Sequence, residues 1–239
     1  MKVAAVIFDA DETIFNNQGI HLLITKKILA TLKMPLELAP EVHTKWDDYY
    51  LSEQQRVIQE NGFCIDRENA NRSLVLALKH AGKEISLEDS DKLWKYVEKE
   101  YTKRSKPYPD ALKLIKHLAK KKIKMAIVSN GDYSIIMKRL QNTKIVHYFD
   151  FVLVPCETFP CSKPDLKIFQ HMVSKLNVPI ENILYVGDNP YSDIFGANRA
   201  GIYTVLIDRY NKNTQLEGLQ KPSLKISTLE ELIKKIDEL

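Results

Sequence analysis

The chain has 239 residues, of which 44% are hydrophobic and 28% are charged, and its formal net charge is +4. That length suits one large domain, or a core with a small accessory domain, and the composition excludes a disordered or fibrous chain. So small a basic excess gives no support to a nucleic-acid-binding protein, which normally concentrates positive charge on one stripe.

The three cysteines, Cys64, Cys156 and Cys161, are too few and odd in number for a disulfide framework, so we predict free thiols in a reducing compartment. The first apolar run, residues 3–8, is too short for the apolar region of a signal peptide. No stretch approaches the roughly 20 apolar residues that cross a bilayer. We therefore expect a cytoplasmic protein without a membrane or nucleic-acid partner.

Short apolar runs rich in Val and Ile predict strands that are buried on both faces. They are residues 3–8, 125–128, 151–154, 183–186 and 203–207. Helical spacing of apolar residues separates the later runs, at 112–118, at 168–176, and from about Asp193 to Gly201. Strands that alternate with helices indicate a parallel α/β sheet.

Between about residues 17 and 104 this alternation stops, and the segment is expected to be almost wholly helical. Ser86 and Asp89, for example, have the spacing of a capping box that opens a helix. A helical insertion after the first strand predicts a separate cap, made of residues 17–104. The α/β core would then comprise residues 1–16 and 105–239.

Ligands of open parallel sheets bind outside the carboxyl ends of the strands, so the residues that directly follow each apolar run are candidates for a site. These positions carry acids, a lysine and small polar residues. They are Asp9, Asp11, Ser129, Asn130, Gly131, Lys163, Asp188 and Asp193. Clustered carboxylates repel one another unless a cation neutralises them, so the set predicts a functional site rather than packing.

The same residues form four motifs in a fixed order. They are Asp9-Ala10-Asp11-Glu12-Thr13, Ser129-Asn130-Gly131, Lys163-Pro164, and Gly187-Asp188 followed by Asp193. Together they resemble the haloacid dehalogenase (HAD) superfamily, in its branch of helical-cap phosphatases similar to nucleotidases and phosphoglycolate phosphatases. The resemblance implies a doubly wound, Rossmann-like parallel sheet with an inserted helical cap. Glu12 departs from the usual Gly of the family, although some nucleotidase-like members share this run.

The resemblance also implies a phosphatase that hydrolyses small phosphate monoesters, either nucleoside monophosphates or sugar phosphates, through an aspartyl phosphate. Asp9 would attack phosphorus, and Asp11 would protonate the leaving alcohol and then deprotonate water. Lys163 would pair with Asp9 and with the phosphoryl oxygens. The Ser129-Asn130-Gly131 segment would hydrogen-bond the phosphate.

The cofactor implied by the resemblance is Mg²⁺, a hard cation that prefers oxygen ligands. Its expected ligands are the carboxylates of Asp9 and Asp188, the backbone carbonyl of Asp11, and Asp193 directly or through a water. Asp193 precedes an expected helix and would also cap it. The six histidines show no pair at metal-ligand spacing.

Substrate choice is expected to depend on the cap and on Asn16, Asn17 and Gln18, where the chain enters it. The cap contains aromatic and basic side chains that could contact a base, a sugar or a second anion. They are Trp46, Tyr49, Tyr50, Arg56, Arg72, Trp94, Tyr101 and Arg104. Aromatics at helical spacing are more often packing residues, and we favour that interpretation. Of these positions, we predict that substitutions at Tyr49, Arg56 and Arg72 change the ranking of substrates.

Three alternatives remain from the sequence. A 2-haloacid dehalogenase would share the fold but needs neither a metal nor the second acid, so Asp11 favours phosphoryl transfer. A sugar-phosphate mutase would keep both acids. A non-catalytic binding module would have no need of the acids. The sequence identifies neither the individual substrate nor the oligomeric state.

Overall fold

The computed structural model describes residues 2–238. Its core is a six-stranded sheet in the order β5-β4-β1-β6-β7-β8, and every neighbouring pair is parallel. The strands are β1 (Ala5–Phe8), β4 (Lys124–Val128), β5 (Phe151–Leu153), β6 (Ile183–Gly187), β7 (Tyr203–Ile207) and β8 (Leu224–Ile226). The five predicted strands are confirmed. The short edge strand β8 was not predicted, because its three residues form no apolar run.

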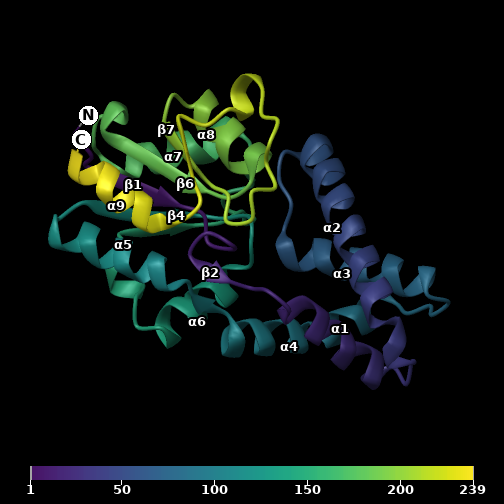
Figure 1. Cartoon of the computed structure of the whole chain (residues 1–239). Helices are drawn as coiled ribbons and strands as arrows, with labels where there is room; N and C mark the ends of the chain where they lie inside the picture. The colour runs from purple at the N-terminus through teal and green to yellow at the C-terminus, as the bar shows by residue number, and fades with distance from the viewer. Residues whose placement is uncertain (1, 239) are drawn as a thin grey trace.

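Helices cover both faces of the sheet, because successive side chains of each buried strand point to opposite sides. Val6 and Phe8 of β1 pack with α5 (Pro109–Lys120), α6 (Tyr133–Asn142) and α9 (Leu229–Glu238). Ala5 and Ile7 pack with α7 (Leu166–Leu176) and α8 (Gly196–Arg199) on the other face (Figure 1). This arrangement confirms the predicted doubly wound α/β fold.

The segment between the first strand and α5 is helical, as predicted, and has a hydrophobic core of its own. Its helices are α1 (Ile20–Thr31), α2 (Ala39–Asn61), α3 (Asp66–His80) and α4 (Leu87–Arg104). Ile24, Leu74 and Trp94 are among the buried residues of this core. Ser86 caps α4 as predicted, since its Oγ accepts a hydrogen bond from the backbone N–H of Asp89. The domain boundaries proposed above stay predictions.

The chain leaves and re-enters the sheet side by side. β2 (Phe15–Asn16) and β3 (Lys106–Pro107) form a short antiparallel pair at this crossing. The helical segment lies beyond the carboxyl edge of the sheet, beside the strand ends (Figure 1). The remaining short turns are η1 (Leu36–Leu38), η2 (Val146–Tyr148), η3 (Ile180–Asn182), the π-helical turn η4 (Pro190–Phe195) and η5 (Gly218–Gln220). Within residues 2–238, no helix combines the length and apolarity needed to cross a membrane.

Candidate active site

Three acids converge where β1 and β6 end. The two strands are neighbours in parallel register, with Phe8 opposite Val186, so the residues that follow them are also neighbours. One carboxylate oxygen from each of Asp9, Asp188 and Asp193 lies within 4.8 Å of the other two. The sequence prediction of an acid cluster at this edge therefore agrees with the observed geometry.

Glycine at position 187 makes room for the third acid. A Cβ atom added to Gly187 would lie 2.4 Å from Cγ of Asp193, a contact that real structures do not tolerate. The carboxylate of Asp193 turns back to accept a hydrogen bond from the backbone N–H of Asn189 at 3.0 Å. Contrary to the prediction, Asp193 lies inside the helical turn η4 and does not cap it. Asn189 is the cap of this turn, with its Oδ1 accepting from the N–H groups of Tyr191 and Ser192.

A buried lysine bridges two of the acids. Lys163 is 3% exposed, and its Nζ donates to Asp9 Oδ1 and to Asp193 Oδ1, both at 2.6 Å. Asn130 holds the backbone of this lysine from two sides, because its Oδ1 accepts from Lys163 N at 2.8 Å and its Nδ2 donates to Lys163 O at 2.9 Å. Asn130 of the second motif therefore positions Lys163 of the third motif. The order of the motifs in the sequence does not reveal this contact.

The acids outnumber the positive charges available to them. Burial raises the pKa of Asp9 to about 7, with Lys163 opposing the rise and Asp193 adding to it. Burial, together with repulsion from Asp9 and Asp193, raises the pKa of Asp188 well above its usual range. Lys163 supplies one positive charge to three clustered carboxylates, and oxygen donors in this number suit a hard divalent cation. The donor set thus fits Mg²⁺.

Asp11 is held by an arginine that the sequence analysis missed. Arg139 on α6 is 2% exposed, and its Nη1 donates to Asp11 Oδ1 at 2.6 Å and to Ser105 Oγ at 3.2 Å. Asn17 Nδ2 donates to the same carboxylate oxygen at 2.6 Å. Burial acts to raise the pKa of Asp11, but the Arg139 guanidinium outweighs it and keeps that pKa below its usual value.

The sequence did contain a signal for Arg139. It follows Ile135 and Ile136 by four and three residues, so it lies on the buried face of an amphipathic helix. A charged residue at such a position needs a buried partner. The partner could not be identified, because Asp11 is 128 residues away along the chain.

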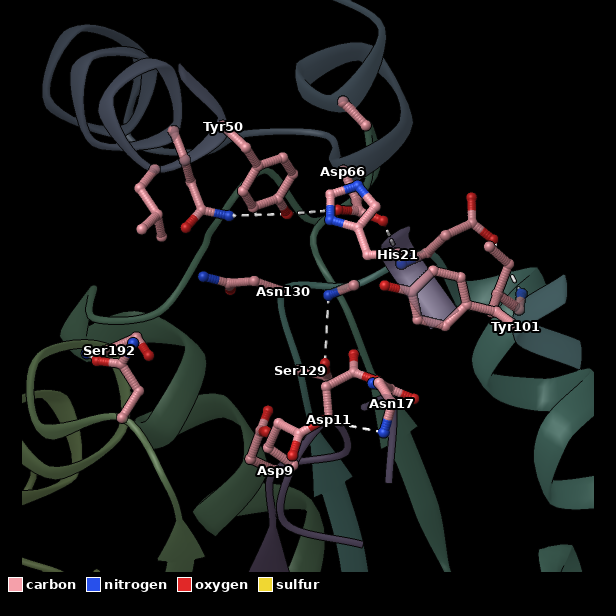
Figure 2. Close-up of a pocket in the computed structure, with 18 of the residues that line it drawn as sticks. Asp9, Asp11, Asn17, His21, Tyr50, Asp66, Tyr101, Ser129, Asn130 and Ser192 are labelled. Carbon is pink, nitrogen blue, oxygen red and sulfur yellow. Dashed lines mark hydrogen bonds between the residues drawn. The ribbon is translucent and has the colours of Figure 1, made fainter. Parts of the chain in front are cut away.

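The second motif lies beside Asp11. Ser129 is buried, and its Oγ accepts a hydrogen bond from the backbone N–H of Gly131 at 3.2 Å. A Cβ atom on Gly131 would approach Asp11 Oδ2 to 3.2 Å, so glycine allows the backbone to come close to the carboxylate. Figure 2 shows Asp9, Asp11 and Ser129 together at the base of the pocket.

All eight predicted site residues line one cavity of about 330 Å³. This size is at the lower end of ligand pockets and suits a small metabolite. The helical segment forms the opposite wall with His21, Trp46, Asp47, Tyr50, Asp66 and Tyr101. In Figure 2, Tyr50, Asp66, His21 and Tyr101 lie across the cavity from Asp9 and Asp11.

Several side chains expected to contact substrate lie elsewhere. Arg56 pairs with Glu53 and Glu60 and, with Arg72, lines a separate surface hollow. Tyr49 is not among the cavity residues. Their predicted effect on substrate ranking therefore has no structural basis.

Other expected positions divide between the cavity and its surroundings. Trp46 and Trp94 belong to the hydrophobic core of the helical segment, as favoured, while also reaching the cavity wall. At the crossing, Asn17 lines the cavity, Asn16 lies in β2, and the Gln18 side chain donates to the Tyr210 hydroxyl. Arg104 is bound to Glu100, so it contributes no charge to the cavity either.

Two histidines that are far apart in the sequence lie close together in the structure. His21 on α1 and His43 on α2 have ring centroids 4.8 Å apart. Both approach Asp47, with His21 Nδ1 at 2.6 Å from Oδ1 and His43 Nδ1 at 3.2 Å from Oδ2. Their separation of 22 residues along the chain gave no sign of this contact, which depends on the packing of α1 against α2.

Comparison with known proteins identifies the class of this fold and site. Residues 6–207 match the sequence profile of the family described as Haloacid dehalogenase-like hydrolase. Because that match spans most of the chain, this protein belongs to the haloacid dehalogenase-like hydrolase family. The resemblance drawn from the four motifs is confirmed.

Individual relatives carry phosphatase names. The chain is 29% identical over 243 residues to a glyceraldehyde 3-phosphate phosphatase from Methanopyrus kandleri, covering 99% of this chain and 98% of that one. It is 33% identical over 127 residues to a pyrimidine 5'-nucleotidase from Escherichia coli, covering 53% and 55% of the two chains.

Solved structures share the whole fold. A HAD-hydrolase from Bacillus subtilis bound to magnesium aligns with a TM-score of 0.83 at 22% identity, covering 99% of this chain and 100% of that one. An L-2-haloacid dehalogenase from Xanthobacter autotrophicus aligns with a TM-score of 0.78 at 19% identity, covering 99% of both. At these identities the likeness establishes the fold and not the reaction.

Proposed function

We propose that this chain is a magnesium-dependent phosphatase that hydrolyses small phosphate monoesters through a phosphoryl group carried on Asp9. The observation that carries the proposal is the buried Lys163 Nζ, 2.6 Å from both Asp9 and Asp193 at the base of the cavity. A carboxylate fixed by a cation is a suitable nucleophile for a group as negatively charged as a phosphate ester. The phosphatase names of the relatives support the same reaction.

The chemistry would proceed in two displacements. A carboxylate oxygen of Asp9 forms a bond to phosphorus while the bond from phosphorus to the ester oxygen breaks, and Asp11 gives its proton to the leaving alcohol. Water then attacks phosphorus, Asp11 accepts its proton, and inorganic phosphate leaves Asp9. Lys163, Ser129 and the backbone around Gly131 would hold the phosphoryl oxygens.

The Mg²⁺ ligands would be the carboxylates of Asp9, Asp188 and Asp193 and the backbone carbonyl of Asp11. When bound, the ion neutralises phosphoryl oxygens and orients the ester for attack. The salt bridge between Arg139 and Asp11 favours ionised Asp11, which suits the step that activates water. For the first step Asp11 must carry a proton, and we predict that it takes one up from solvent as it turns from Arg139 toward the leaving oxygen.

The test replaces the nucleophile. With p-nitrophenyl phosphate and Mg²⁺, Asp9→Asn should reduce turnover to background while circular dichroism stays unchanged, because the amide is neutral but nearly the same size. Asp48→Asn is the matched control, since Asp48 is exposed on α2 and does not line the cavity. Activity should also vanish in EDTA and return with Mg²⁺. Substantial turnover by Asp9→Asn, once deamidation is excluded, would overturn the assignment.

The same assay can expose the alternatives. Release of chloride from 2-chloropropionate in EDTA would support a dehalogenase, and interconversion of sugar phosphates without release of phosphate would support a mutase. We do not expect dehalogenation, because Asp11 and the acid cluster have no purpose in that reaction. We do not expect mutase activity, because the named relatives are phosphatases, which release free phosphate. The cytoplasmic location stays a prediction.

A further inference from the structure

The cavity wall that faces the leaving group is acidic. Asp66 begins α3, and its carboxylate is fixed from two sides, accepting from the Tyr50 hydroxyl through Oδ1 and from the backbone N–H of Asp132 at 3.1 Å through Oδ2. Gln54 Nε2 in turn donates to the Tyr50 hydroxyl at 3.2 Å. Both Asp66 and Tyr50 are therefore held in place rather than free to turn out of the cavity.

The base on this wall is already matched by an acid. His21 lines the cavity, but its Nδ1 lies 2.6 Å from Asp47 Oδ1, so a proton on His21 is balanced by that carboxylate. Asp47 also lines the cavity. Asp47 is also contacted by His43 Nδ1 at 3.2 Å, whereas Asp66, in the described part of the chain, accepts only from the neutral Tyr50 hydroxyl and a backbone N–H.

Among residues 2–238, no lysine or arginine that lines the cavity pairs with Asp66. Within residues 2–238, Lys163 and Arg139 are the only lysine and arginine side chains that line the cavity. Both lie on the sheet side, where Lys163 is bound to Asp9 and Asp193 and Arg139 is bound to Asp11. The guanidinium of Arg56 is outside, as described above.

We propose that the cavity takes phosphate monoesters whose alcohol is uncharged and carries hydroxyl or carbonyl groups, and that Asp66 rejects esters with a second anion. This inference rests on the proposed phosphatase function. Hydroxyl groups of such an alcohol can donate to the carboxylates of Asp66 and Asp47 and to the phenol oxygen of Tyr101, so a neutral polar leaving group is well matched. A carboxylate or second phosphate in the same place would meet the like charge of Asp66 in a partly desolvated space.

A matched pair of esters tests this directly. Glycerol 3-phosphate and 3-phosphoglycerate have the same three-carbon skeleton and differ in that the second has a carboxylate at the far carbon. We expect wild-type kcat/KM to be at least about tenfold higher for glycerol 3-phosphate, the order expected from one repulsion between unit charges across such a cavity. The same preference should appear in the Kd values of the two esters, measured by calorimetry with Ca²⁺ in place of Mg²⁺ to slow turnover.

Variants locate the preference. Asp66→Asn should raise kcat/KM for 3-phosphoglycerate several-fold relative to glycerol 3-phosphate, because Asn removes the negative charge and can still accept from Asp132 N and donate to Tyr50. Asp47→Asn should change this ratio less, because His21 and His43 already contact that carboxylate. The control Asp48→Asn makes the same change of net charge outside the cavity and should leave the ratio as in the wild type.

The outcomes separate the two proposals. Equal rates for both esters, or a preference for 3-phosphoglycerate, would overturn the inference whether or not the variants fold, since that measurement uses the wild type. Hydrolysis of neither ester nor of p-nitrophenyl phosphate, with the preference kept in the Kd values, would overturn the phosphatase reaction and still support this selectivity. A change of ratio in Asp48→Asn equal to that in Asp66→Asn would also count against the assigned residue.

Discussion

Replacing Lys163 with Met removes the cation that holds the acid cluster together. The side chain is 3% exposed, and it is bound to two carboxylates at 2.6 Å that are themselves buried. Met keeps most of the volume of the lysine stem, so the change isolates the charge. Removing one partner of a buried ion pair typically costs about 3–5 kcal/mol, because the remaining charge is left uncompensated. For a chain of this size that corresponds to a fall in Tm of about 6–20 °C.

The effect should depend on metal and on pH. We expect the full loss at about pH 8 in EDTA, measured by thermal or urea unfolding, and a smaller loss in Mg²⁺, which would supply positive charge to the same oxygens. The loss should also shrink at about pH 5.5, because Asp9, whose pKa is raised to about 7 by burial, then takes up a proton.

The matched control is Lys113→Met. That lysine is 64% exposed and pairs with Glu230 at the surface, so the same substitution should change Tm little. Equal stability of Lys163→Met and the wild type in EDTA at about pH 8 would refute the idea that this lysine neutralises the acids. A loss of the same size with and without Mg²⁺ would show that the ion does not reach them.

The other predictions concern Asp11, Asp193 and Asp66. Arg139→Met should lower kcat for p-nitrophenyl phosphate by about 10–100-fold and shift the pH profile of kcat, since Asp11 loses its partner. An unchanged pH profile would mean that Arg139 serves packing alone. Gly187→Ala should weaken Mg²⁺ binding by about tenfold or more, as measured by calorimetry, because the added methyl group displaces Asp193. An unchanged affinity for Mg²⁺ would exclude Asp193 from the metal site. Burial raises the pKa of Asp66 to about 6, so the folded protein binds the extra proton between about pH 4 and 6 and loses stability as pH rises through that range. Relative to the wild type, Asp66→Asn should therefore gain about 1–3 kcal/mol of unfolding free energy on going from pH 4 to pH 8, as measured by urea unfolding, and no gain would contradict the raised pKa.

The parallel sheet and the convergence of its polar residues could be predicted from the sequence. Apolar runs that end in Asp9, Ser129 and Asp188 mark strands, and in a parallel sheet their carboxyl ends meet at one edge whatever the details of packing. The third acid, Asp193, was placed at this edge by the resemblance of the fourth motif to the family, in which it follows Asp188 by five residues. The candidate site on the sheet side thus follows from local pattern and topology together.

The opposite wall of the cavity was decided by tertiary structure. Arg56 and Asp66 both lie on helices of the inserted segment, yet Arg56 faces outward and Asp66 faces the acids, because the packing of α2 and α3 sets which side of each helix meets the sheet. Arg139 contacts Asp11, and His21 contacts Asp47, although the partners are far apart along the chain. Local sequence patterns do not reveal contacts of this kind. Helical periodicity determines which residues share a face, but only the assembled helices determine what that face meets. The sequence by itself therefore determined which acids and which lysine meet at the strand ends, whereas the charge of the opposite cavity wall depended on the fold.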